Sequence, residues 1–201
     1  LSELKDRHRF ILLLDEAHGS GVYGAAGAGY AAEKGLASRV DVSIVTLSKA
    51  LGCVGGAVCA SKEFCAAVVN HGRAFVYSTA LPPMIAAAVT EAIALLREEP
   101  WRQSTVRAMA REVRASIEKM GVAVPAGDAP IIPVIVGDEQ RALAISGRLA
   151  EARLLVPAVR PPSVPRGGSR LRITLCCEHT PDELRRLVDA LGEAVSRCEG
   201  R

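Results

Sequence analysis

The sequence has few aromatic residues, little net charge and no long apolar run. Aromatic side chains make up 3% of the 201 residues, and the net charge is +3, with Lys and Arg scattered among Asp and Glu. Nucleic-acid binding is therefore not expected, because it needs a basic stripe and rings on which bases can stack. No apolar run reaches the roughly 18 residues that a membrane span requires, so no such span is expected.

An initiator Met and a secretory leader are also missing. The chain opens on "LSELKDRHRF", which resembles the approach to a buried strand, and we interpret it as the C-terminal fragment of a longer protein. Cysteine is present without any C-x-x-C pair, so neither a zinc site nor a disulfide framework is expected. Buried thiols in a reducing, cytoplasmic compartment are expected instead, with organelle targeting left open. The cysteines are Cys53, Cys59, Cys65, Cys176, Cys177 and Cys198.

What is present is an alternation of strand and helix signals, typical of an α/β protein. The hydrophobic content of 49% suffices for a folded core. We expect a first domain over residues 1–99, with a mostly parallel sheet covered on both faces, and a small α+β domain over residues 100–201. Expected strands are 10–15, 40–48, 55–61, 75–79, 131–138, 154–159 and 170–177; expected helices are 62–72, 82–100, 101–121, 139–153 and one from Thr180 onward.

The stretch "DEAHGSGVYG" at 15–24 matches two well-known motifs. A dinucleotide fingerprint needs its first Gly directly after the strand, but "EAH" separates the strand from Gly19. A helicase of the DEAH type needs a downstream "SAT" box, whereas this chain has "TLSKALG" after its next strand. Neither interpretation is favoured.

Lys49 and Asp15 suggest a different chemistry. Lys49 follows a β-branched strand and lies in a Ser/Gly turn without neighbouring charges, so we expect it in a cleft with reduced hydration. Desolvation favours the neutral amine that forms a Schiff base. Asp15, at the carboxyl end of the preceding strand, is a suitable partner for the pyridinium nitrogen of pyridoxal phosphate.

Four motifs in order resemble the α-oxoamine synthases, enzymes of the fold-type I pyridoxal phosphate class that join an amino acid to an acyl-CoA. They are "LLLDEAHGSGVYG", "TLSKALGCVGG", "FVYSTALPP" and "RPPSVPRGGSRLRITLCCEHT", and together they extend over nearly the whole chain. The resemblance implies the C-terminal half of the cofactor-binding large domain, followed by the small domain. It also implies a homodimer with a shared active site.

The resemblance further implies a role for each matching residue. Lys49 would form the Schiff base and act as the catalytic base, Asp15 would bind the ring nitrogen, and His18 would bind the phenolic oxygen. Thr46 would contact the cofactor, while Ser78 and Thr79 would reach the phosphate of the neighbouring subunit. A turn histidine at 18 and a helix-capping role for 78 and 79 stay as alternatives, and His179 with Thr180 is expected to begin a helix.

Arg172 is the expected substrate-binding residue, because a guanidinium can hold a carboxylate through two parallel hydrogen bonds. Arg170, on the same strand face, is its competitor. Arg160 lies in the "RPPSVP" turn, which varies within the family, so it is expected to influence the ring environment or acyl selection.

That turn most resembles the family members that join L-alanine to a pimeloyl thioester in biotin biosynthesis. Serine palmitoyltransferase, 2-amino-3-ketobutyrate CoA ligase and 5-aminolevulinate synthase are alternatives. A non-catalytic subunit of the same fold is a further one, although such subunits commonly lack the lysine. The ring-stacking aromatic residue and the glycine-rich phosphate loop of the family would lie upstream of this chain.

Overall fold

The computed structural model describes residues 1–198 and divides the chain into two units, Leu1–Gln103 and Ser104–Arg201. The last three residues of the expected small domain lie outside the described residues. The boundary between the two units falls within helix α6 (Trp101–Lys119), whereas the sequence predicts a domain boundary near residue 100. Each unit has a sheet of its own.

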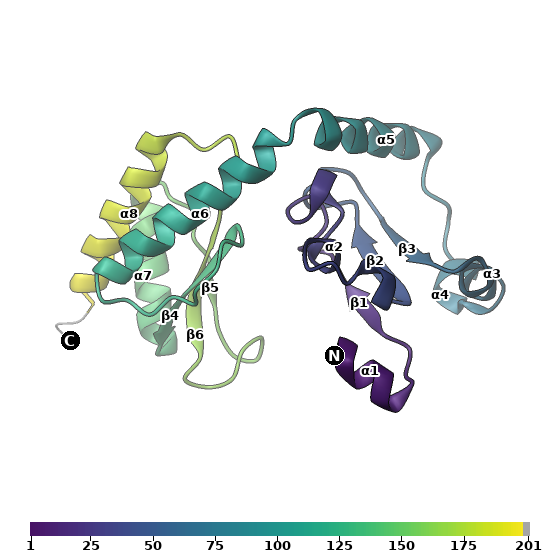
Figure 1. The fold of residues 1–201 in the computed structure, drawn as a ribbon. Helices are drawn as coiled ribbons and strands as arrows, with labels where there is room; N and C mark the ends of the chain where they lie inside the picture. The colour runs from purple at the N-terminus through teal and green to yellow at the C-terminus, as the bar shows by residue number, and fades with distance from the viewer. Residues whose placement is uncertain (199–201) are drawn as a thin grey trace. The chain divides into compact units, whose positions relative to one another are not determined.

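The first unit is built on a three-stranded sheet of order β1-β2-β3 (Figure 1). β1 pairs with β2 in parallel, with Asp15 opposite Ile44, and β2 pairs with β3 in antiparallel. The elements are α1 (Ser2–His8), β1 (Leu13–Asp15), α2 (Tyr30–Glu33), β2 (Val42–Thr46), β3 (Gly56–Ala60), α3 (Lys62–His71), α4 (Arg73–Val76) and α5 (Pro83–Glu98), with short 3-10 turns at Ala25–Gly27 and Ala37–Arg39.

Local signals explain where these helices begin. The Ser61 hydroxyl accepts a hydrogen bond from the Phe64 N–H at the start of α3, and Pro83 occupies the first turn of α5, where its missing N–H costs nothing. The strand expected over 75–79 is wrong, because residues 73–76 form helix α4. Gly72 and Arg73 accept hydrogen bonds from the N–H groups of Val76 and Tyr77, and no strand pairs with the segment within residues 1–198.

The expectation of a sheet covered on both faces is also wrong for the described part of the chain. Val42 is the one buried apolar residue among the described residues of the first unit, and β3 is mostly exposed. The expected buried thiols are absent as well: all six cysteines are free, Cys59 and Cys176 are exposed, and the other four are half-buried. An apolar sequence run shows what could be buried, whereas burial itself depends on what packs against it.

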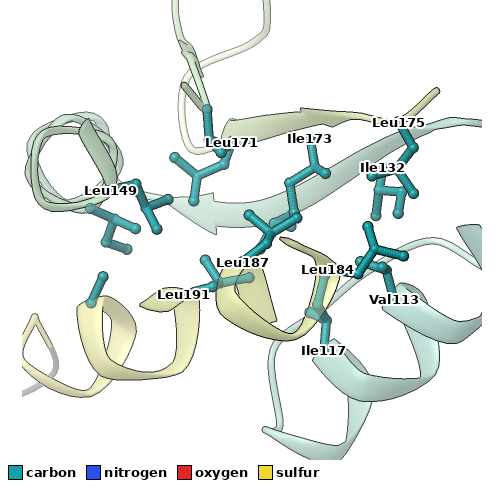
Figure 2. Close-up of a cluster of buried hydrophobic side chains, with 14 of the residues drawn as sticks. Val113, Ile117, Ile132, Leu149, Leu171, Ile173, Leu175, Leu184, Leu187 and Leu191 are labelled. Atoms are coloured by element: carbon teal, nitrogen blue, oxygen red, sulfur yellow. The ribbon is translucent and has the colours of Figure 1, made fainter. Parts of the chain in front are cut away.

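The second unit has a complete core. Besides α6, its elements are β4 (Ile131–Gly137), α7 (Glu139–Glu151), β5 (Ala158–Val159), β6 (Ser169–Thr174) and α8 (Pro181–Ser196). The sheet has the order β4-β6-β5 with antiparallel pairs, and the buried side chains of β6 meet those of α6, α7 and α8 (Figure 2). The fully buried residues there include Ile132, Ile145, Leu149, Leu171 and Leu191.

Within residues 1–198, no helix has the length and apolar character that crossing a membrane would need.

Candidate active site

The carboxyl edge of the β1–β2 pair brings four of the expected site residues to one end of the first sheet. Asp15 ends β1, and Thr46, which ends β2, lies two residues beyond Ile44, the register partner of Asp15. Carboxyl ends of neighbouring parallel strands share one edge of a sheet, where loops of α/β proteins bind ligands. The turn with His18 follows β1 there, and the turn with Lys49 follows β2.

Gly21 brings these two turns into contact. Its φ of 77° lies in the left-handed region, and a Cβ at this position would stand 2.5 Å from the Cβ of Ala50, the residue after Lys49. Only glycine fits this close approach without strain. The middle glycine of "GSGVYG" therefore serves close packing between the two turns, whereas Gly19 and Gly24 approach Glu16 and the Gly29–Glu33 segment. Local packing thus explains the nucleotide-like pattern in this place.

The Lys49 turn is closed by backbone hydrogen bonds. The N–H of Leu47 donates to the Gly55 carbonyl at 2.9 Å, and the N–H of Cys53 donates to the Leu47 carbonyl at 2.7 Å. The hydroxyls of Thr46 and Ser48 lie 3.0 Å apart. These bonds fix the turn and leave the amine of Lys49 without a hydrogen-bond or ion-pair partner among residues 1–198.

The expected reduced hydration of Lys49 is wrong for this chain, because its side chain is exposed. The physical reason is that Ser48, Lys49 and Ala50 are all exposed, because the described segments that contact this turn leave the side with the lysine open to solvent. The desolvation argument for a neutral amine therefore has no support in the described residues.

Asp15 is exposed, and its Oδ1 accepts a hydrogen bond from the Ala17 N–H at 2.9 Å. Its other oxygen has no partner within residues 1–198. His18 is also exposed and has an interaction within the chain. Between them, Glu16 is 5% exposed, and its carboxylate accepts N–H bonds from Tyr30 at 3.0 Å and Ala31 at 2.8 Å.

Glu16 is a site residue that the sequence pattern does not identify, because nothing in "DEAH" distinguishes its second residue from a solvent-exposed carboxylate. Glycines at 19 and 29 were the available signal, since both approach the Glu16 side chain closely. A Cβ would stand 1.8 Å from Glu16 Oε2 at Gly19 and 2.9 Å from Glu16 Oε1 at Gly29.

Ser78 and Thr79 follow α4 in an exposed segment of the first unit. They do not cap α5, whose N-cap residue is Pro82 and which has no side-chain cap bond. Large apolar side chains flank them: Phe75 is 60% exposed, Tyr77 81% and Met84 73%. This segment therefore presents two hydroxyls within an exposed apolar surface.

The arginines belong to the second unit and differ in their partners. Arg160 donates to Glu139 Oε1 at 2.6 Å, and Arg170 donates through Nε to the Gly168 carbonyl at 2.8 Å. Arg172 is exposed on β6, on the face opposite Leu171 and Ile173. Its guanidinium has no partner among the described residues.

Thr180 is confirmed as the start of a helix, because it forms a capping box with Glu183 at the N-terminus of α8. His179 stands beside it and accepts the Cys176 N–H through Nδ1 at 3.1 Å. No group of three or more His, Cys, Asp or Glu side chains within residues 1–198 is arranged to hold a metal ion.

The sequence of this chain is similar to those of known proteins. A sequence model of the aminotransferase class I and II family matches residues 1–191. The 8-amino-7-oxononanoate synthase of Anaeromyxobacter dehalogenans is 40% identical over 195 residues, 97% of this chain and 49% of that protein. The enzyme of that name from Stutzerimonas stutzeri is 40% identical over 188 residues, 93% of this chain and 48% of that protein.

Among solved structures, a serine palmitoyltransferase from S. paucimobilis with a bound adduct of PLP and myriocin superposes with a TM-score of 0.93 at 28% identity. The match covers 98% of this chain and 50% of that one. The chain thus spans about half the length of the relatives it matches.

Proposed function

Because the chain belongs to the aminotransferase class I and II family, we propose that the complete protein is a pyridoxal phosphate-dependent acyltransferase with Lys49 as its cofactor lysine. The observation on which this depends is the contact of Gly21 with Ala50, which joins the turn after Asp15 to the turn of Lys49. The relatives named 8-amino-7-oxononanoate synthase and the PLP-containing structure support the same assignment.

The residues present fit this cofactor. A Schiff-base lysine needs an amine that no structural ion pair occupies, and the Lys49 amine has no partner among the described residues. A ring-nitrogen partner needs an available carboxylate oxygen, and Asp15 has one. When bound, pyridoxal phosphate supplies an electron sink for negative charge at the α-carbon of an amino acid.

Residues of the first unit would bind the cofactor and transfer the proton of the substrate α-carbon. Asp15 would keep the ring nitrogen protonated, His18 would donate to the phenolic oxygen, and Thr46 would contact the ring. Lys49 would hold the cofactor and, once an amino acid takes its place, remove and return the proton at the α-carbon.

The proposed reaction is the decarboxylative condensation of an amino acid with an acyl-CoA. A carbon–carbon bond forms between the α-carbon and the thioester carbonyl, CoA leaves as its thiol, and the amino-acid carboxylate leaves as CO2. An α-aminoketone results. Following the two named relatives, L-alanine and pimeloyl-CoA are the proposed substrates, as in biotin biosynthesis. Arg172 would bind the amino-acid carboxylate, and Arg160 would influence acyl selection.

A serine palmitoyltransferase-type reaction is the second candidate, favoured by the structural similarity with a TM-score of 0.93. Steady-state rates with alanine or serine, each paired with pimeloyl-CoA or palmitoyl-CoA, separate the two. A higher kcat/KM for the alanine and pimeloyl pair supports the first candidate. A non-catalytic subunit would show no turnover with any pair.

We further propose that the complete protein is a cytoplasmic homodimer whose Ser78 and Thr79 contact the cofactor phosphate of the partner subunit. The resemblance to the α-oxoamine synthases supports this proposal, and both hydroxyls are exposed and so available for such a contact.

The lysine assignment is tested by reduction. The complete protein incubated with pyridoxal phosphate should show a visible absorbance band that borohydride abolishes, and peptide mapping should place the reduced label on Lys49. Lys49→Ala should lose the band, whereas the control Lys62→Ala, which removes an exposed lysine at the start of α3, should keep it. A label on another lysine would contradict the assignment.

A further inference from the structure

Glu16 is a buried carboxylate that the proposed chemistry does not use. It is 5% exposed, and no salt bridge to it occurs within residues 1–198. A buried charge is costly unless hydrogen bonds stabilise it. Here the stabilisation comes from backbone donors, the N–H groups of Tyr30 and Ala31, at 3.0 and 2.8 Å.

Both the N–H and the carbonyl of Glu16 also form hydrogen bonds. Its N–H donates to the Ile44 carbonyl of β2 at 2.8 Å. Its carbonyl accepts from the N–H groups of Gly19 and Ser20 and from the Ser20 hydroxyl, at 2.9, 2.8 and 2.9 Å. One residue therefore connects the middle of β2, the turn after β1 and the start of α2.

The surrounding glycines show that this arrangement has little tolerance for extra atoms. Gly19 belongs to the turn with His18, and Gly29 directly precedes α2, whose first N–H groups donate to the carboxylate. Side chains at either position would overlap with Glu16, at 1.8 Å and 2.9 Å. The carboxylate is thus held between two glycines, with the exposed Asp15 and His18 on either side of it in the chain.

We propose that Glu16 is a positioning residue: its buried carboxylate fixes the start of α2 against the turn that presents Asp15 and His18 to the cofactor. This inference rests on the proposed function for the identity of the cofactor. Its structural part, the fixing of the turn, depends only on the described contacts.

Glu16→Gln tests the proposal with little change in volume. The amide has one acceptor oxygen, and its NH2 group would face a backbone N–H, so at least one of the two bonds is lost. Asp41→Asn is the matched control. The Asp41 carboxylate also accepts a backbone N–H in the first unit, that of Leu12 at 2.7 Å, and Leu12 lies before β1, at the opposite end of the strand from the Asp15–His18 turn.

In the complete apoprotein, Glu16→Gln should speed hydrogen exchange at Gly19, Ser20, Tyr30 and Ala31, by about tenfold or more for the loss of one bond to a charged group. With pyridoxal phosphate added, the dissociation constant should rise by a similar factor, about tenfold, and the visible band should shift or weaken. Asp41→Asn should change neither the exchange at Gly19 and Ser20 nor the band.

The outcomes separate this inference from the proposed function. If the unaltered protein binds no pyridoxal phosphate, the proposed function fails, and the exchange at Gly19 and Ser20 still decides whether Glu16 fixes the turn. Unchanged exchange in Glu16→Gln overturns the inference. So does faster exchange combined with an unchanged dissociation constant and band in a protein that binds the cofactor, because Glu16 would then have a structural role alone.

Discussion

Arg170 and Arg172 lie on the same face of β6, and the sequence alone makes either a candidate for binding a carboxylate. Their hydrogen-bond partners distinguish them. Arg170 and Arg172 both point away from the core of the second unit. The Nε of Arg170 already donates to the Gly168 carbonyl at 2.8 Å, which ties the guanidinium to the turn before β6. Arg172 is exposed and has no partner among the described residues, so it is the better candidate for a substrate carboxylate.

We predict that Arg172→Leu raises the KM for the amino acid by about ten- to a hundredfold, because a hydrogen bond between charged groups contributes about 1.5–3 kcal/mol. Arg170→Leu should instead lower stability slightly and leave this KM near its original value. Steady-state kinetics with the amino acid varied at saturating acyl-CoA would measure both. An unchanged KM in Arg172→Leu, with a large rise in Arg170→Leu, would transfer the role to Arg170.

Among the elements, α8 has the most clearly defined start. Thr180 and Glu183 form a reciprocal capping box, and the helix then buries Leu184, Leu187 and Leu191 in the core (Figure 2). The N–H of Thr180, with a further contribution from its hydroxyl, lowers the pKa of Glu183 below its ordinary value. The charged form of Glu183 therefore stabilises the folded state.

The lowered pKa of Glu183 makes the free energy of unfolding depend on pH. A lowered folded pKa means that the contribution of Glu183 is present above its unfolded pKa and is lost as pH falls through the folded pKa. Glu183→Gln should be less stable than the unaltered protein at neutral pH, and the difference should disappear in strong acid. Thr180→Ala should cost about 1 kcal/mol at neutral pH.

Chemical unfolding at several pH values would measure these effects. The control is Asp189→Asn, an equal change of charge at an exposed position further along α8. A Glu183→Gln deficit that persists unchanged in acid would show that the capping charge is not its cause.

Most elements could be predicted from sequence, because caps and periodicity act locally. The helices α3, α5, α6, α7 and α8 lie where the sequence placed them, to within a few residues. The segment "FVYST" was misassigned, since its β-branched and aromatic residues favour a strand only where a partner strand exists. Burial was the weakest prediction: the exposure of Lys49 and of the cysteines depends on packing that local pattern does not contain.

The candidate site could be predicted in part for a similar reason. Asp15 and Thr46 end adjacent parallel strands, so their shared edge follows from the strand order. Glu16 could not be identified from its own position, because its importance comes from backbone N–H groups 14 and 15 residues away in the chain. Contacts at that separation become visible only in the folded structure.

At the scale of the whole molecule, the two units differ in how much of their apolar surface is buried. The second unit surrounds a continuous core, whereas the first unit exposes large apolar side chains, including those around Ser78 and Thr79. Exposed apolar surface of this kind favours association with another protein surface. Because the chain spans about half the length of its relatives, the rest of the complete protein would cover part of this surface, and a partner subunit at Ser78 and Thr79 would complete the proposed phosphate contact.

This arrangement predicts complementation between two inactive variants of the complete protein. If Thr79 serves the site of the partner subunit, then a heterodimer of Lys49→Ala and Thr79→Ala chains has one site lacking both groups and one intact site. Random exchange of subunits should restore about a quarter of the original sites, because about half of the dimers are mixed and each has one intact site. If Thr79 instead serves the site of its own chain, every site in the mixture lacks one group, and mixing restores nothing.

Activity and the borohydride-sensitive absorbance band, recorded before and after exchange, distinguish the two arrangements, and Lys49→Ala mixed with itself is the control. Mixed dimers that form in the expected proportion, verified by mass spectrometry with one chain tagged, yet recover neither signal would show that the Thr79 hydroxyl does not reach across the dimer.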